Sequence, residues 1–390
     1  MISFEEAYQQ VIRSACAPAS EHIQLNDALH RILAAQVVSD TDMPPFNKSA
    51  VDGFACRRDD LAGELECLET IPAGVVPRMD IRSGQCSRIM TGSIVPEGAD
   101  MVVMVEDTIT TGEGKIRFVK DRSATNICYR AEDIRKGDVV LYPGSLIRPQ
   151  EIAVMASVGY VSPEVYRQPR VGVISTGDEL VEPVDTPRWS QIRNSNASQL
   201  LAQLAAMGIR GTYYGIAMDE MNSLKDLLDE AMRSCDVTLV TGGVSMGAYD
   251  HVAGALEQLK VKIIFHSIAI QPGRPTVFGM GERTYIFGLP GNPVSSFVIF
   301  ELLVKPMLYK LMGNEHQPVL NRLPMGIAHS RKRSDRKSFI PVMVKDGKVI
   351  PVTYHGSAHI HSYVQADGII TIEVGQTRLN EGELVDVRQI

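Results

Sequence analysis

The residues best suited to chemistry follow an apolar run near position 240. The stretch VTLVTGGVSMGAYDHV spans Val237 to Val252, and its apolar start is rich in β-branched residues. It passes directly into Gly242 and Gly243, and an acid, Asp250, follows. Adjacent glycines let a backbone approach another group closely or adopt positive φ. Their amides, ahead of a helix, suit an anionic group such as phosphate.

This loop matches neither of two common nucleotide-binding motifs. No G-K-[ST] follows the glycines, and GGVSMG departs from the spacing of G-x-G-x-x-G. P-loop hydrolysis and NAD binding are therefore disfavoured. Taken alone, the Gly-Gly pair is equally consistent with a tight turn.

Strand and helix patterns alternate around this loop. RVGVIS, GTYYGIA, VTLVT and TYIFGLP have strand character, and NASQLLAQLAAMG, NSLKDLLDEAMRS and DHVAGALEQL have helical spacing. This alternation predicts a doubly wound, mainly parallel α/β sheet. Ligands of such sheets bind beyond the carboxyl ends of the strands, so the residues after each strand are the candidates for a site.

Each of three successive strands is followed by an acid: Glu179, Asp219 and then Asp250. Carboxylate oxygens are ligands that Mg²⁺ prefers, so the three acids could hold this metal. Any one of them could instead cap a helix, as Asp250 could at the start of DHVAGALEQL. The last strand leads into GLPGNPVSS, where Asn292 is expected to cap a helix and Pro293 to occupy its first turn.

Composition narrows the class of protein. A chain of 390 residues is longer than one ordinary domain. A net charge of −7 argues against general nucleic-acid binding, and no apolar run approaches the roughly 20 residues of a membrane span. Six scattered cysteines without a C-x-x-C pair favour free thiols in a reducing cytoplasm.

The regions flanking the α/β pattern differ from it. The first forty residues look helical and amphipathic, the Gly- and Pro-rich region after them carries short strand patterns, and GSLIRPQEIAVMASVGY returns to helix. SFIPVMV and KVIPVTY predict a hairpin that turns at Asp346 and Gly347. The predicted domains are a discontinuous helical linking domain (1–40 and 136–168), a β-rich inserted domain (41–135), the α/β domain (169–313) and a C-terminal small β-barrel (314–390).

Seven motifs occur in order along nearly the whole chain: PPFNKSAVDGFA, RIMTGSIVPEGADMVVMVED, AEDIRKGD, STGDEL, TGGVSMGAYD, IQPGRPTVFG and GLPGNPVSS. Together they resemble the molybdopterin molybdenumtransferase family, which includes the bacterial MoeA proteins and the gephyrin E domain. The resemblance implies the final step of molybdenum cofactor biosynthesis. In that step adenylated molybdopterin and molybdate, with Mg²⁺, give the molybdenum cofactor and AMP.

The resemblance also implies which residues act. The implied catalytic residues are Asp52, Thr91, Asp133, Glu179 and Asp250. The implied metal ligands are Glu179, Asp219 and Asp250. The implied substrate-binding residues are Gly242, Gly243, Ser245, Asp219, Arg274, Pro290, Gly291, Asn292, Pro293, Ser295 and Ser357. Without the resemblance, Asp52 and Thr91 would be interpreted as turn residues, because Asp-Gly and Thr-Gly are common in turns.

The chain departs from the family pattern around the oxyanion. Relatives often have basic residues where this sequence has Ser267, Gln271 and Pro341. Arg274 is then the clear cation of its segment, and a rebuilt molybdate pocket would use Arg274, Ser295 and Arg336. Molybdate and tungstate have nearly the same size and charge, so the sequence does not separate them.

Family members are homodimers with a shared active cleft, which implies that Asp52 and Thr91 complete the site of a partner subunit. The resemblance also implies transient contact with the molybdopterin adenylyltransferase. The net charge and the lack of a long apolar run predict no nucleic-acid or membrane partner. Two other functions stay open. One is a scaffold that docks peptides at the dimer interface, as gephyrin-type relatives do; the other is a different phosphate-handling enzyme that needs no molybdate. The set of acids favours the transferase.

Overall fold

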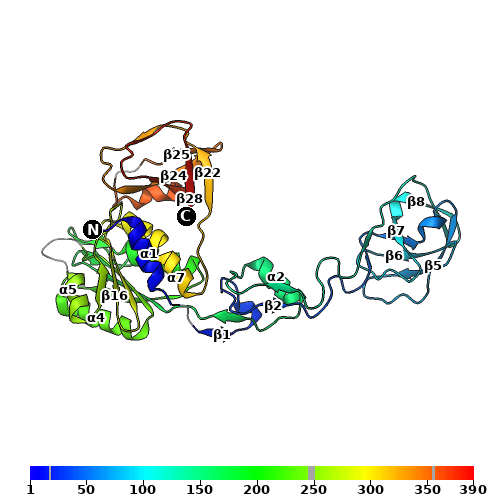
Figure 1. The fold of residues 1–390 in the computed structure, drawn as a ribbon, viewed down its shortest axis with the longest axis horizontal. Coiled ribbons are helices and arrows are strands. Elements are labelled where there is room, and N and C mark those ends of the chain that lie inside the picture. Colours follow the sequence, from blue (N-terminus) through cyan, green and yellow to red (C-terminus); the bar gives the residue numbers. More distant parts are fainter. Residues whose placement is uncertain (17–18, 245–250, 354–355) are drawn as a thin grey trace. The chain divides into compact units, whose positions relative to one another are not determined.

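The computed structural model describes residues 1–16, 19–244, 251–353 and 356–390, and it forms two compact units (Figure 1). Unit 1 comprises residues 1–34, 144–148 and 163–390. Unit 2 comprises residues 35–143 and 149–162. The four domain boundaries expected from the sequence stay predictions, because this division places the α/β region and the C-terminal strands in one unit.

A six-stranded sheet lies at the centre of unit 1. Strand β20 runs opposite to the other five, so the prediction of a mainly parallel sheet is confirmed. The strand order is β16 (Gly211–Ala217), β13 (Val171–Thr176), β17 (Val237–Thr241), β21 (Tyr285–Leu289), β20 (Val277–Met280) and β18 (Lys262–Phe265).

Helices cover both faces of this sheet. Val173 and Leu239 pack with α3, α6 and α7 on one face, whereas their chain neighbours Ile174 and Val240 pack with α4 and α5 on the other. Successive side chains of a strand point to opposite faces, so a sheet covered on both sides needs continuous apolar runs such as VTLVT. The helices are α3 (Ser195–Ala206), α4 (Met221–Ser234), α5 (His251–Gln258), α6 (Pro293–Ile299), the π-helix η4 (Phe300–Val304) and α7 (Lys305–Leu311).

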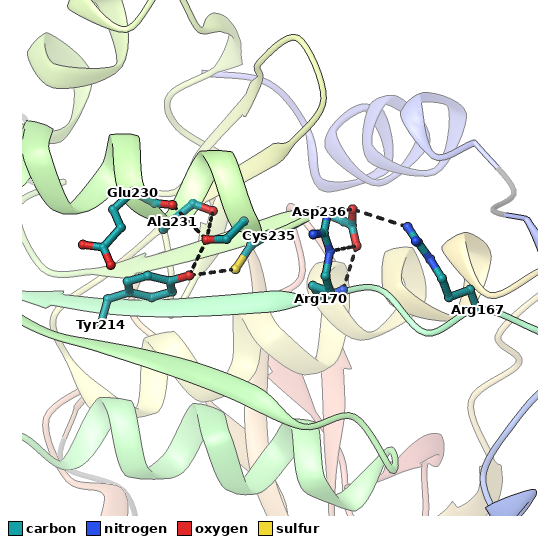
Figure 2. A network of polar contacts seen from close by, with 8 residues as sticks. Arg167, Arg170, Tyr214, Glu230, Ala231, Cys235 and Asp236 are labelled. Atoms are coloured by element: carbon teal, nitrogen blue, oxygen red, sulfur yellow. Dashed lines mark hydrogen bonds and ion pairs between the residues drawn. The ribbon is translucent and has the colours of Figure 1, made fainter.

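An ion pair joins the amino ends of β13 and β17 (Figure 2). The guanidinium of Arg170 donates to Asp236 Oδ1 at 2.9 Å and to Oδ2 at 3.2 Å, and its backbone amide donates to Oδ2 at 2.8 Å. Arg167 lies 3.9 Å from the same carboxylate. Burial alone would raise the pKa of Asp236, but the bonds from Arg170 outweigh it and the pKa is lowered. Close by, the Tyr214 hydroxyl lies 3.4 Å from Cys235 Sγ.

The C-terminal strands of unit 1 form a second sheet that curls into a small barrel. Met325, just after β22, bridges to Val349 of β25, which itself pairs with β24, so β25, β24, β26, β28 and β22 close on themselves. The predicted hairpin is confirmed: Lys345 pairs with Lys348, and Asp346 and Gly347 have φ of 51° and 72°. The strands are β19 (Ile270–Gln271), β24 (Lys337–Lys345), β26 (Gly368–Ile372), β28 (Leu384–Gln389), β22 (Leu320–Pro324) and β25 (Lys348–Pro351).

The expectation that residues 1–40 are helical is wrong beyond Ser14. Helix α1 (Phe4–Ser14) begins with a capping box between Ser3 and Glu6 and ends where Ala15 turns extended at ψ 122°. The chain then forms paired strands that are too short to show a period. They are β1 (Ser20–His22) with β12 (Glu164–Tyr166), and β2 (Val37–Val38) with β11 (Val139–Leu141), while the returning helix is α2 (Pro149–Ser157).

Unit 2 contains its own six-stranded sheet. At Gly53 a Cβ atom would lie 1.9 Å from the carbonyl oxygen of Val103, so only glycine lets β4 and β7 pair this closely. The strand order is β7 (Met101–Met104), β4 (Gly53–Cys56), β6 (Gln85–Ile89), β5 (Glu64–Ile71), β9 (Lys115–Phe118) and β8 (Thr108–Gly112).

Short elements complete the described part of the chain. The remaining strands are β3 (Lys48–Ser49), β10 (Ile127–Cys128), β14 (Leu180–Val181), β15 (Ile192–Arg193), β23 (His329–Ser330) and β27 (Arg378–Leu379). The 3₁₀ helices are η1 (Leu25–Asp27), η2 (Arg58–Asp60), η3 (Val105–Asp107) and η5 (Ile360–Gln365). None of the helices within the described ranges combines the length and the apolar character needed to cross a bilayer.

Candidate functional site

The carboxyl ends of β13, β17 and β21 meet at one edge of the sheet in unit 1. Gly242 follows β17 with φ 95°, and a Cβ there would lie 2.2 Å from the carbonyl oxygen of Thr176. Its amide donates to the carbonyl of Leu289 at 3.1 Å, so the loop is fixed to both neighbouring strands. Gly243 also has positive φ, at 62°. Close backbone approach thus requires glycine at Gly242, and positive φ favours it at Gly243.

Two of the three predicted metal ligands lie at this edge. Asp219 follows β16, and its Oδ1 accepts a hydrogen bond from Thr176 Oγ1 at 2.8 Å. Glu179 follows β13, and its carboxylate lies over Gly177, where a Cβ would be 2.4 Å from Oε2. The strands β13 and β16 pair in parallel, which brings these two acids together. The third acid, Asp250, and the predicted substrate-binding residue Ser245 lie outside the described residues.

One acid at this edge was missed by the sequence analysis. Asp178 Oδ1 accepts a hydrogen bond from the amide of Asp219 at 2.9 Å and so holds the loop after β16 against the loop after β13. Its signal was present in TGDEL, where two acids stand side by side.

The acids at this edge have the ligand atoms that a hard divalent cation prefers. Glu179 and Asp219 offer carboxylate oxygens, which are the donors that Mg²⁺ takes. Within the part of the chain that the structure describes, no cluster of three or more His, Cys, Asp and Glu residues could hold a metal. Protein ligands for Mg²⁺ are commonly one or two carboxylates, with substrate phosphates and water completing the octahedron. The two acids therefore fit a metal that substrate helps to hold.

A buried asparagine, also missed from sequence, ties two of the loops. Asn196 in the first turn of α3 donates from Nδ2 to Thr241 Oγ1 at 2.8 Å and to the carbonyl of Gly291 at 2.7 Å. Its side-chain carbonyl is buried, and none of the described residues donates to it. The loop that contains Pro290 and Gly291 is thereby held beside the glycines after β17.

Beside this edge, unit 1 contains a pocket of about 360 Å³ rich in arginine. The three residues expected to rebuild the oxyanion site, Arg274, Ser295 and Arg336, all line it. Guanidinium and hydroxyl donors are the groups that bind tetrahedral oxyanions. The other lining residues are Ile270, Gln271, Pro272, Gly273, Pro275, Pro290, Asn292, Arg333, Asp335, Gly356 and Ser357.

The loop that carries Arg336 is held in place by a neighbouring arginine. The guanidinium of Arg331 donates to the carbonyl of Arg336 at 2.7 Å and to the carbonyl of Gln376 at 2.8 Å. Arg336 Nε lies 3.4 Å from Asp335 Oδ2. Of the three positions that depart from the family pattern, Gln271 lines the pocket, whereas Ser267 is buried and Pro341 is paired within β24.

Asn292 lies at the predicted cap position, but its side chain bonds to Ser357 and not to the helix. It is the N-cap residue of α6 and Pro293 follows in the first turn, yet no side-chain capping bond forms. Instead Asn292 Nδ2 donates to Ser357 Oγ at 2.7 Å. The carbonyl of Ser357 accepts from the amide of Val294 at 3.1 Å. The C-terminal segment therefore satisfies the helix start, and Asn292 and Ser357 line the pocket together.

Asp52 and Thr91 form a close pair in unit 2. Asp52 Oδ1 accepts hydrogen bonds from the hydroxyl and the backbone amide of Thr91, both at 2.7 Å. The pairing of β4 with β6 opposes Gly53 to Ile89 and so brings the residues before and after these strands together. The bonds from Thr91, with the charge of Arg88 adding less, lower the pKa of Asp52. The result is an exposed, ionised carboxylate held in one orientation.

Within the described ranges, no hydrogen bond joins Asp133, the third predicted residue of unit 2, to this pair. Asp133 is exposed, and its backbone amide donates to the carbonyl of Met43 at 3.1 Å. Six residues further along the chain, in β3, Ser49 donates its amide to the carbonyl of Ser93, near Thr91. The segment that begins at Met43 and continues through PPFNKSAVDGFA therefore contacts both the backbone of Asp133 and the loop that carries Thr91.

Comparison with known proteins gives one consistent result. Three family models match: the MoeA N-terminal region (domain I and II) over residues 2–159, a probable molybdopterin binding domain over 172–310, and the MoeA C-terminal region (domain IV) over 328–390. The molybdopterin molybdenumtransferase of Staphylococcus epidermidis is 34% identical, with 99% of this chain and 95% of that protein covered.

Two further relatives point to the same family. The molybdopterin molybdenumtransferase of Bacillus subtilis is 33% identical over 99% of this chain and 93% of its own length. The crystal structure of the molybdopterin biosynthesis MoeA protein of Pyrococcus horikoshii OT3 is 29% identical, covers all of both chains and superposes with a TM-score of 0.84.

Proposed function

Because the chain belongs to the MoeA family of molybdopterin molybdenumtransferases, we propose that it inserts molybdate into adenylated molybdopterin with release of AMP. This is the final step of molybdenum cofactor biosynthesis. The observation that carries the proposal is the arginine-lined pocket beside the glycine loops and acids of the α/β sheet. The scattered free cysteines support a cytoplasmic location.

The glycine loops bind the phosphates of the nucleotide. Gly242 and Gly243 follow β17 with positive φ and carry no side chains of their own between the main chain and a ligand. Asp219 and Glu179 would hold Mg²⁺ at the same edge. When bound, this metal supplies positive charge that offsets charge on a phosphate being cleaved. Thr176 fixes one oxygen of Asp219, which leaves the carboxylate in a defined orientation.

The oxyanion binds in the arginine-lined pocket. Arg274 and Arg336 donate to the dianion, and Ser295 and Ser357 add hydroxyl donors. Arg331 is a positioning residue in this scheme, because it holds the backbone of Arg336. Proximity of oxyanion and pterin substrate then supplies much of the rate enhancement.

We further propose a homodimer in which Asp52 and Thr91 complete the site of the partner subunit, with transient contact to the molybdopterin adenylyltransferase. The support is the pairing of Asp52 with Thr91 on an exposed surface of unit 2, where the ionised carboxylate faces solvent, together with the family resemblance, which assigns both residues to the active cleft. A two-fold dimer gives two equal sites from one self-complementary interface.

The direct test is AMP release from adenylated molybdopterin by purified protein. We expect release to require both molybdate and a divalent cation, with Mg²⁺ and Mn²⁺ compared, and tungstate titrated in parallel. AMP release without any oxyanion would favour a different phosphate-handling enzyme. Binding of the nucleotide without turnover in any metal would favour the scaffold.

The shared site is tested by complementation. Asp52→Ala and Asp219→Ala subunits, each inactive alone, are unfolded together and refolded. Random pairing makes about half of the dimers mixed, and one of the two sites in each mixed dimer carries neither change, so about a quarter of wild-type activity should return. A mixture that stays inactive while subunits demonstrably exchange would place Asp52 in its own subunit's site.

A further inference from the structure

Three of the six cysteines lie in a row across the sheet of unit 2. Cys56 of β4 pairs in register with Cys86 of β6, and Cys67 of β5 pairs with the same Cys86 from the other side. All three contribute to one apolar cluster with Phe54 and Leu65, so their side chains lie on the same face of the sheet. The proposed transfer reaction uses none of them.

The three thiols differ in access. Cys56 and Cys86 are fully buried, whereas Cys67 is partly exposed at the edge of the cluster. Interaction with Cys86 on the facing strand, and with the backbone and charge of Arg88, outweighs burial and lowers the pKa of Cys67 to about 6. The Cys67 thiol also lies 3.7 Å from the carbonyl oxygen of Glu69, to which it donates. Burial, with the charges of Asp100 and Asp60, raises the pKa of Cys56 to about 12. Cys67 is therefore the thiol that is both ionised and reachable.

We propose that Cys67 is an oxidation site for small peroxides and that Cys86 resolves it as a disulfide joining β5 to β6. The Cys67 thiolate attacks one oxygen of the hydroperoxide, the O–O bond breaks, and hydroxide or alkoxide leaves. The product is a sulfenic acid on Cys67. The Cys86 thiol then attacks that sulfur, the S–O bond breaks, and water leaves with the Cys86 proton. Two electrons pass from the two thiols to the peroxide.

The strand geometry permits this bond and makes it reversible. Neighbouring strands lie about 4.8 Å apart, within the range of roughly 4.4–6.8 Å between Cα atoms of a disulfide. The Cβ atoms of in-register side chains lie near that same spacing, which is wider than the usual distance of about 3.8 Å between the two Cβ atoms of a disulfide. The bond is therefore strained and easily reduced. Cys56 is equally near Cys86 in register, but it stays protonated and is the matched control in the same sheet.

The test uses the reduced full-length protein and hydrogen peroxide near equimolar amounts. Wild type should lose about 2 Da in intact mass, and non-reducing peptide mapping should join Cys67 to Cys86. Cys67→Ser and Cys86→Ser should both abolish the loss, while Cys56→Ser and the exposed Cys16→Ser should retain it. In Cys86→Ser, dimedone should label Cys67 as the trapped sulfenic acid.

A second measurement is independent of the cross-link. The rate of peroxide consumption should rise with pH around 6 in wild type, and this inflection should move up towards about 8.5 in Cys86→Ala, which removes the neighbouring thiol that lowers the pKa of Cys67. A bridge between Cys56 and Cys86, a mass loss that persists in Cys67→Ser, or oxidation confined to Cys16 would each overturn the proposal.

Discussion

The two ends of the α/β sheet in unit 1 are built from the same strands but differ in their residues. At the carboxyl end, Gly242 has no side chain and packs closely against the backbone of Thr176, and the carboxylate of Asp219 is held by the Thr176 hydroxyl. At the amino end, the backbone amide, Nε and Nη2 of Arg170 all donate to the carboxylate of Asp236 (Figure 2). The comparison teaches that strand direction separates the two tasks: chemistry is placed at one end and anchoring at the other. Changes of the same type at the two ends should therefore have different consequences.

The largest expected effect comes from a carboxylate-to-amide pair. Asp219→Asn should lower AMP release about a hundredfold, because the amide keeps the shape but loses the charge that a metal needs. Asp236→Asn makes the same change at the opposite end and should leave turnover of the folded protein unaltered. Steady-state AMP release at saturating substrates measures both. Equal losses in the two variants would remove the distinction between the ends.

The next effect concerns the backbone at the carboxyl end. Gly242→Ala should lower the free energy of unfolding by about 2 kcal/mol beyond the strain of positive φ, because its Cβ would overlap the carbonyl of Thr176. Gly215→Ala is the control: Gly215 has φ 103°, but its Cβ would meet nothing within 4 Å. Urea unfolding of the two variants separates overlap from strain. Equal destabilisation would mean that the close approach at Gly242 contributes nothing.

A smaller effect is expected from the arginines. Arg274→Ala should raise the molybdate concentration for half-maximal activity by roughly tenfold, as expected for one lost charge-assisted hydrogen bond. Binding of the pterin nucleotide, measured by calorimetry, should change much less. Arg170→Ala, at the amino end, should leave molybdate dependence unchanged. Parallel losses of oxyanion and nucleotide affinity in Arg274→Ala would contradict a separate oxyanion pocket.

The smallest effect is on stability at the amino end. Asp236→Asn should cost about 1 kcal/mol at neutral pH, since the ion pair is partly exposed. The pKa of Asp236 is lowered in the folded state, so its contribution is present above the ordinary pKa near 3.8 and is lost as pH falls through the lowered value. Unfolding curves of wild type and variant should therefore converge as the pH falls well below the ordinary pKa of 3.8. A difference that persists there would have to come from packing.

Sequence periodicity located the strands and helices of the α/β region because buried runs and amphipathic helices have strong periods. The strands β13, β16 and β17 and the helix α4 lie where their patterns placed them. Residues 20–38 were misjudged because strands of two or three residues have no measurable period. Pairing with segments more than 100 residues away determines their structure.

The site was predictable to the extent that it depends on local sequence. Acids after strand ends follow from topology, so Glu179 and Asp219 could be expected at one edge. The bond between Asn292 and Ser357 could not, because its partners are 65 residues apart and a cap was the local alternative. Asn196 was missed for the same reason, since an asparagine in a first helical turn usually signals a cap. The pair of Asp52 and Thr91 was expected only through the family resemblance.

The contacts of helix α1 bear on the order in which the protein can be completed during synthesis. Ala7 and Val11 pack in the core that includes α7, and Lys337 pairs with Glu5 across a separation of 332 residues. The sequence of α1 therefore emerges from the ribosome long before the core surface that it packs against has been synthesised. Most of unit 2, by contrast, is a continuous stretch that is complete by residue 162. Unit 2 can fold first, and the N-terminal helix must wait, with its apolar face uncovered, until nearly the whole chain has emerged.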